Sequence, residues 1–92
     1  MTRNSCIKKN SDNIVTNEID GELVMVNIDM GKYYGFDNIG TKVWELIEEE
    51  TKIADIIKKL LEEYNAPEEI IEKDVLKFLT KLEEERIIKI VF

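Results

Sequence analysis

The sequence predicts an α+β domain: a three-stranded antiparallel sheet followed by a winged-helix-like three-helix bundle with a short C-terminal strand or hairpin. Two observations carry this prediction. Apolar residues repeat with a period of 2 between residues 14 and 36 and with a period of 3.6 from residue 37 onward. Short turn-forming segments separate the periodic runs, and short connections favour compact packing of the elements.

The strand region reads as a meander. Two β-rich runs, Ile14–Ile19 and Glu22–Ile28, are separated by Asp20-Gly21, a pair typical of a type I′ hairpin turn. A second turn, with the sequence DMGK, leads into a short third run, Lys32–Phe36. In the middle strand, Val24, Val26 and Ile28 share one face, and we expect that face to be the core side, with Leu23 and Met25 on the other.

Three amphipathic helices follow. Asp37 is a plausible N-cap for a helix over residues 38–50, and Thr51 can cap the second helix. Pro67 suits the first turn of a third helix, which is expected to run to about Glu85. The positions expected to face inward are Ile39, Val43, Leu46 and Ile47, then Ile53, Ile56, Ile57, Leu60, Leu61 and Tyr64, then Ile71, Val75, Phe78, Leu79 and Leu82.

The two ends of the chain differ in character. Residues 1–12 are polar and aperiodic and are expected to form a flexible N-terminal arm, which leaves 13–92 as a single domain. The C-terminal segment RIIKIVF is rich in β-branched residues and is expected to form a final strand or hairpin.

Composition narrows the classes of function. The chain has 92 residues and a formal net charge of −7, so it should repel phosphate backbones, and we expect no nucleic-acid partner. No apolar run approaches the ~20 residues that a membrane helix needs, so no membrane partner is expected either. The single Cys6 fits a reducing compartment, and the expected location is the cytoplasm.

The residues that usually carry catalysis are missing. The sequence contains no histidine, which removes the commonest general base and most zinc and di-iron sites. The acidic clusters at 48–50, 62–63 and 83–85 read as solvated charge at helix ends and faces. The sequence therefore predicts that the protein is not an enzyme, with no catalytic residue, no metal site and no cofactor.

Aromatic residues gather around the third strand. Alternation places Tyr34 and Phe36 on one face and Tyr33 on the other, while Trp44 of the first helix is expected in the core. In a meander the third strand is an edge, and here it is poorly protected against pairing. Gly35 either permits a bulge or leaves room for another backbone. An extended peptide could add to this edge as a strand.

These residues resemble the PqqD-like family, also called RiPP recognition elements. The resemblance spans roughly residues 13–90, nearly the whole domain, and rests on a combination of features, since no single motif is diagnostic. The matching positions are Tyr34, Phe36, Asn38, Gly40, Trp44, Leu46, Ile53, Ile57, Leu60, Tyr64, Asp74-Val75, Phe78-Leu79 and Leu82.

The resemblance implies a non-catalytic protein that binds the leader segment of a ribosomally synthesised precursor peptide. It presents the leader to a modifying enzyme such as a leader peptidase, a cyclase or a radical enzyme. The leader is expected to extend the sheet beside the third strand, in a groove closed by the third helix; which flank of that helix faces the groove stays open. The implied peptide-binding residues are Lys32, Tyr33, Tyr34, Gly35 and Phe36 on the strand and Asp74, Phe78 and Lys81 on the helix.

Two details refine the resemblance. Many members have a glycine in the turn after the third helix, where this chain reads EEERII, so the geometry of that turn stays open. The helix that carries Trp44 is closer to the stand-alone elements of lasso-peptide pathways than to the pyrroloquinoline quinone chaperone.

Other readings compete with this one. The runner-up is a winged-helix DNA-binding regulator, although Lys73, Lys77 and Lys81 are outnumbered by acidic residues on the third helix. A third reading is an accessory subunit or fragment of a larger synthetase. The open edge could also pair two copies, or the hairpin could swap between them, which would give a homodimer.

Overall fold

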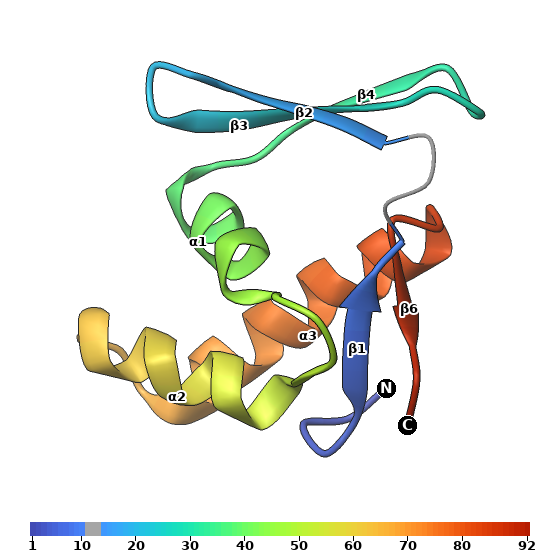
Figure 1. Cartoon of the computed structure of the whole chain (residues 1–92). Helices are drawn as coiled ribbons and strands as arrows, with labels where there is room; N and C mark the ends of the chain where they lie inside the picture. Colours follow the sequence, from blue (N-terminus) through green and yellow to red (C-terminus); the bar gives the residue numbers. More distant parts are fainter. Residues whose placement is uncertain (11–13) are drawn as a thin grey trace.

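The computed structural model describes residues 1–10 and 14–92, which form two antiparallel sheets and three helices (Figure 1). One sheet has the strand order β2-β3-β4, and the other has the order β5-β1-β6. The strands are β1 (Cys6–Lys9), β2 (Ile14–Ile19), β3 (Glu22–Asn27), β4 (Lys32–Gly35), β5 (Thr51–Lys52) and β6 (Ile88–Ile90). The helices are α1 (Asn38–Leu46), α2 (Ile53–Glu63) and α3 (Glu68–Glu84).

The predicted meander is confirmed and lies across one side of the helices, at the top of Figure 1. Asp20 and Gly21 have φ values of 52° and 81°, which is the left-handed conformation that a type I′ turn requires. The turn fixes the register, because Ile19 lies directly opposite Glu22 and the pairing continues to Ile14 opposite Asn27.

The face of this sheet that contacts the helices is the opposite of the predicted one. Leu23, Met25 and Asn27 are buried, whereas Ile28 is 59% exposed. The prediction relied on β-branched residues, which favour strands on either face. The buried face includes the polar Asn27, whose amide nitrogen lies 3.4 Å from the Glu85 carbonyl oxygen. The residues wrongly assigned to the core side are Val24, Val26 and Ile28.

The described part of the N-terminal segment, residues 1–10, does not form a flexible arm. Residues 6–9 form β1, which pairs with β5 on one side and β6 on the other, and Ile7 has no exposed surface. This expectation failed because a single buried apolar residue in a polar segment leaves no periodic signal. Residues 11 and 12 of the predicted arm lie outside the described residues.

The same segment caps α2. Lys52, at the N-cap, makes no side-chain capping bond. Instead, the Ile53 N–H donates to the Ser5 carbonyl at 3.0 Å and the Ala54 N–H donates to the Arg3 carbonyl at 2.9 Å, which satisfies two free donors of the first turn. The predicted Thr51 cap is therefore wrong.

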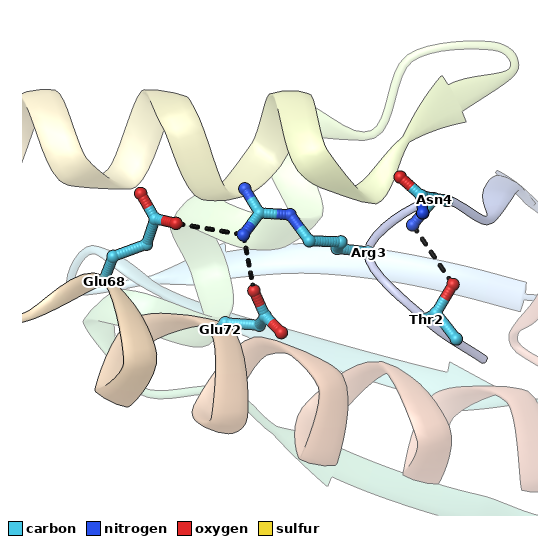
Figure 2. A network of polar contacts seen from close by, with 5 residues as sticks. All are labelled: Thr2, Arg3, Asn4, Glu68 and Glu72. Atoms are coloured by element: carbon cyan, nitrogen blue, oxygen red, sulfur yellow. Dashed lines mark hydrogen bonds and ion pairs between the residues drawn. The ribbon is translucent and has the colours of Figure 1, made fainter.

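Arg3 also connects the N-terminal segment to the start of α3, as Figure 2 shows. One guanidinium nitrogen lies 2.9 Å from a Glu68 carboxylate oxygen and 2.7 Å from a Glu72 carboxylate oxygen. These contacts raise the pKa of Arg3, the hydrogen bond to Glu68 first among them. The segment before β1 thus contacts both α2 and α3.

The first helix begins at its predicted cap, whereas Pro67, expected in the first turn of the third helix, lies at the N-cap of α3. The Asp37 carboxylate accepts a hydrogen bond from the Gly40 N–H at 2.7 Å, which confirms it as the N-cap of α1. α1 ends at Leu46, four residues before the predicted end, and Ile39 is 46% exposed although an inward position was expected. Trp44 is buried as predicted.

One core joins the helices to both sheets. Its buried apolar side chains come from every helix, from β1, β3 and β6, and from the residues next to the strands. They are Ile7, Leu23, Met25, Phe36, Val43, Trp44, Ile47, Ile53, Ile56, Ile57, Leu60, Ile71, Val75, Leu79, Leu82, Ile87 and Ile88.

The turn after α3 contains a residue in the left-handed backbone conformation, and this residue is not glycine. Arg86 has a φ of 61°. Its N–H donates to the Glu83 carbonyl at 3.0 Å and the Ile87 N–H donates to the Leu82 carbonyl at 2.8 Å, which is the hydrogen-bond pattern of a Schellman motif. The missing family glycine therefore leaves the helix ending intact, at the cost of placing a Cβ in a disfavoured conformation.

Arg86→Gly is expected to raise the free energy of unfolding by about 0.5–1 kcal/mol, because glycine adopts the left-handed conformation without a steric penalty. Urea denaturation followed by circular dichroism measures the change. Arg86→Ala is the matched control, since it removes the same charge and keeps the Cβ. Equal stabilities of the glycine and alanine variants would contradict the assignment of strain to this residue.

Candidate functional site

The strand β4 leaves one edge open. β4 pairs only with β3 among the described strands, and the Phe36 N–H donates to the Leu23 carbonyl at 2.9 Å. Peptide groups in an antiparallel pair alternate in direction along the strand. The N–H and C=O groups of Tyr34 therefore point toward β3, as those of Phe36 do. The N–H and C=O groups of Tyr33 and Gly35 consequently point away from the sheet, at its open edge.

The side chains of β4 alternate as predicted. Phe36, just after the strand, is buried and Tyr34 is half-buried on the face toward the helices. Tyr33 is on the opposite face and is 78% exposed. A Cβ added at Gly35 would meet no atom within 4 Å, so the space beside this residue is open.

A hydrogen-bonded link connects β4 to the end of α3. The Tyr34 hydroxyl donates to the Glu85 carboxylate at 2.7 Å, and the Lys32 ammonium lies 3.3 Å from the same oxygen. The hydrogen bonds from Tyr34 and then Lys32 lower the pKa of Glu85. Desolvation, followed by the hydrogen bond to Glu85, raises the pKa of Tyr34 to about 12. This link holds the open strand at a fixed position relative to α3.

The link predicts a specific dependence of stability on pH. The folded-state pKa of Tyr34 is about 12, above the value of about 10 expected in the unfolded chain. Its contribution is therefore fully present below pH 10 and is lost as pH rises toward 12. For Glu85, with a lowered pKa, the contribution is present above its unfolded pKa and is lost as pH falls through the folded one.

Tyr34→Phe tests this dependence. The stability difference between wild type and Tyr34→Phe should shrink between pH 10 and 12, because only the wild type loses the Tyr34 contribution there. Urea unfolding at several pH values measures the difference. An NMR titration should also show a higher pKa of Glu85 in the variant. A stability difference that stays constant up to pH 12 would contradict a stabilising link between Tyr34 and Glu85.

Two adjoining hollows run beside β4 and α3. Phe36 and Phe78 meet between the strand and the helix, with ring centroids 5.2 Å apart and ring planes at 83°. Asp37, Phe78 and Lys81 line both hollows, which therefore adjoin. The first hollow is lined by Tyr33, Tyr34, Gly35, Phe36, Asp37, Phe78, Lys81, Leu82 and Glu85. The second is lined by Asp37, Ile39, Gly40, Val43, Asp74, Val75, Lys77, Phe78 and Lys81. We refer to the two together as the groove.

Most residues proposed from sequence come together at the groove. Tyr33, Tyr34, Gly35 and Phe36 share the first hollow with Phe78 and Lys81. Asp74 lines the second hollow only. Lys32 lines neither hollow, and its ammonium group contacts Glu85 instead. The flank of α3 that faces the groove is thus the one that carries Asp74, Phe78 and Lys81.

Sequence reasoning missed three charged residues of the groove, Asp37, Lys77 and Glu85. Asp37 was assigned only to helix capping, yet it also lines both hollows. Glu85 belongs to an acidic run that reads as solvated charge, and no local pattern shows that Tyr34 reaches it across 51 positions. A tyrosine on the inner face of the predicted edge strand was the one available signal that a polar partner was needed.

Metal and membrane sites are absent from the described part of the chain. Among residues 1–10 and 14–92, no group of three or more His, Cys, Asp or Glu side chains is placed to hold a metal ion. Over the same residues, no helix has the length and apolarity needed to cross a membrane.

The fold and the groove define a class of protein: a small winged-helix-like α+β domain whose open sheet edge lies beside a helix. Such an edge suits the addition of an extended peptide strand. A sequence model of the family described as Coenzyme PQQ synthesis protein D (PqqD) matches residues 22–88. The chain belongs to the PqqD family.

Two solved structures share the fold of this chain. The chain is similar to a structure described as TbiB1 in complex with the TbiA(beta) leader peptide, with 30% identity and a TM-score of 0.80 over 89% of this chain and 94% of that one. It also shares its fold with a lasso peptide synthetase B1 complexed with the leader peptide, at 17% identity and a TM-score of 0.74 over 90% and 96% of the two chains. A comparison with curated proteins finds no match.

Proposed function

We propose that this protein recognises the leader segment of a ribosomally synthesised precursor peptide and presents it to a modifying enzyme, without catalysing a reaction itself. The observation that carries the proposal is the open edge of β4 beside the groove. Both similar structures are complexes with a leader peptide, and the first is 30% identical to this chain.

The geometry suggests how the leader binds. A leader strand that pairs with β4 receives hydrogen bonds from the N–H groups of Tyr33 and Gly35 and donates to their carbonyls. Alternate leader side chains then point into the groove toward Phe78 and Lys81, while the others lie on the exposed face beside Tyr33. Backbone bonds supply affinity, and the groove supplies selectivity among leaders.

The groove offers apolar walls with charges of both signs at its border. The rings of Phe36 and Phe78 form the apolar part, and the first hollow also contains the basic Lys81 and the acidic Asp37 and Glu85. A leader segment with apolar residues at alternate positions fits this surface better than a highly charged one. The proposed peptide-binding residues are Lys32, Tyr33, Tyr34, Gly35, Phe36, Asp74, Phe78 and Lys81, with Lys32 acting through Glu85.

The proposed partner enzyme is a leader peptidase, a cyclase or a radical enzyme that acts on the same precursor. The likeness to the synthetase B1 structure favours the lasso-peptide type. A homodimer that formed through β4 would compete with the leader for the same edge. The DNA-binding alternative gains no support, because α3 presents its lysines among acidic residues on a chain of net charge −7.

Titration with a synthetic leader tests the proposal. The first probe is the leader of a short precursor found by inspecting the neighbouring genes, which we call the neighbouring leader, and the TbiA(beta) leader serves as a second probe. We expect micromolar or tighter binding, on the order of −8 kcal/mol, by calorimetry. A scrambled leader of the same composition is the control. The proposal fails if neither leader binds, and salt-sensitive binding to duplex DNA would favour the regulator instead.

A further inference from the structure

Gly40 occupies a position where its backbone conformation does not require glycine. It lies in the first turn of α1, it is buried, and its φ is not in the left-handed region. Glycine lowers the stability of a helix relative to alanine. A packing contact, not backbone freedom, must therefore account for the small residue.

That contact is with Phe78 of α3. A Cβ at position 40 would lie 3.2 Å from Cζ and 3.3 Å from Cε1 of the Phe78 ring, and 3.1 Å from the Asp37 carboxylate oxygen. The carboxylate is already held by its 2.7 Å hydrogen bond to the Gly40 N–H. A Cβ at position 40 would thus require the Phe78 ring to shift by a few tenths of an ångström away from α1.

The ring has little space to move except toward the groove. Phe36 packs against it edge-to-face, with centroids 5.2 Å apart. Phe78 is only half-buried and lines both hollows, so its remaining free side faces the groove. A displaced ring would narrow the passage where the two hollows adjoin.

We propose that Gly40 is a positioning residue for peptide recognition: by seating the Phe78 ring against α1, it keeps the two hollows joined as one continuous groove. This inference rests on the proposed function of the groove. It adds Gly40, which lines the second hollow, as the residue that determines the width of the groove at its middle through the Phe78 ring.

A double-mutant cycle with the synthetic neighbouring leader as probe tests the inference. Gly40→Ala should weaken binding by about tenfold through the displaced ring. In a Phe78→Leu background, where the ring tip is absent, adding Gly40→Ala should change affinity by less than about twofold. Asn38→Ala is the matched control, because it places an alanine in the same first turn at an exposed position that lines neither hollow.

A measurement without peptide separates this inference from the proposed function. In the free wild-type protein, nuclear Overhauser contacts should join the Phe78 ring to the Gly40 α-protons, and in Gly40→Ala the Phe78 ring signals should shift while the melting temperature stays near that of Asn38→Ala. If wild type binds no leader, the proposed function fails and the inference with it. If wild type binds and Gly40→Ala binds equally well, only the role of Gly40 is overturned.

A folding defect in Gly40→Ala would still leave a decisive comparison. Should that variant unfold, the double variant relieves the overlap and is compared with Phe78→Leu alone. Equal affinities of those two variants support action through Phe78, and a large difference contradicts it.

Discussion

Gly35→Pro is expected to weaken leader binding by at least about thirtyfold, while the domain stays folded. The Gly35 N–H faces the open edge of β4, so proline removes a donor that the leader needs and not one that the sheet uses. Loss of that bond leaves a leader carbonyl unpaired in the groove, which costs about 2–3 kcal/mol. Calorimetric titration gives the affinity, and circular dichroism gives the fold.

Two controls isolate the donor. Gly35→Ala keeps the N–H and adds a methyl group into open space, so the ratio of the alanine and proline affinities measures the hydrogen bond. Thr16→Pro removes a donor from the opposite edge of the same sheet. Peptide groups alternate in direction along each strand, and the register of β2 against β3 places the Thr16 N–H on the free side of β2, pointing away from β3. Equal loss of binding in Thr16→Pro and Gly35→Pro would rule out pairing specific to β4.

Ile7→Ala is expected to lower the free energy of unfolding by about 2–5 kcal/mol, a large share of the stability of a small domain. Ile7 has no exposed surface and belongs to the main core, although it lies in a polar segment. Its strand joins β5 to β6, so loss of this side chain also weakens the pairing that holds both ends of the domain together. Urea unfolding measures the change.

Ile90→Ala is the matched control for this prediction. Ile90 lies directly opposite Ile7 on β6 but is 40% exposed, so the same truncation should cost less than about 1 kcal/mol. A cost at Ile7 as small as that at Ile90 would mean that the N-terminal segment is a dispensable arm after all.

The β2–β3 hairpin and the start of α1 could be predicted from short stretches of sequence. Asp20-Gly21 predicts its hairpin because only certain residues tolerate two successive left-handed conformations. Asp37 predicts the start of α1 because its carboxylate can satisfy a free N–H of the first turn. Both predictions depend only on residues that are neighbours in sequence, so they require no knowledge of the tertiary structure.

The errors arose where distant segments decide the outcome. β1 contains one buried residue, and its role depends on β5 and β6, which lie far away in the chain. The cap of α2 comes from the carbonyls of Arg3 and Ser5, which no sequence pattern near Thr51 reveals. The inner face of β3 carries Asn27, whose amide nitrogen contacts the Glu85 carbonyl 58 positions away.

Only part of the candidate site could be predicted, because the rest depends on contacts between distant segments of the chain. The edge position of β4 follows from the order of a meander, and its aromatic residues are visible in the sequence. The groove is a property of two helices and a strand, so the contributions of Asp37, Gly40 and Glu85 required the packed structure. The family resemblance supplied the helix residues that periodicity alone left ambiguous.

Amide hydrogen exchange, measured by NMR with and without the neighbouring leader, tests the central claim most directly. If the leader adds to β4 as a strand, the amide protons of Tyr33 and Gly35 should gain protection, while that of Thr16 on the far edge should not. Saturating leader that leaves the exchange of Tyr33 and Gly35 unchanged would contradict strand addition at this edge.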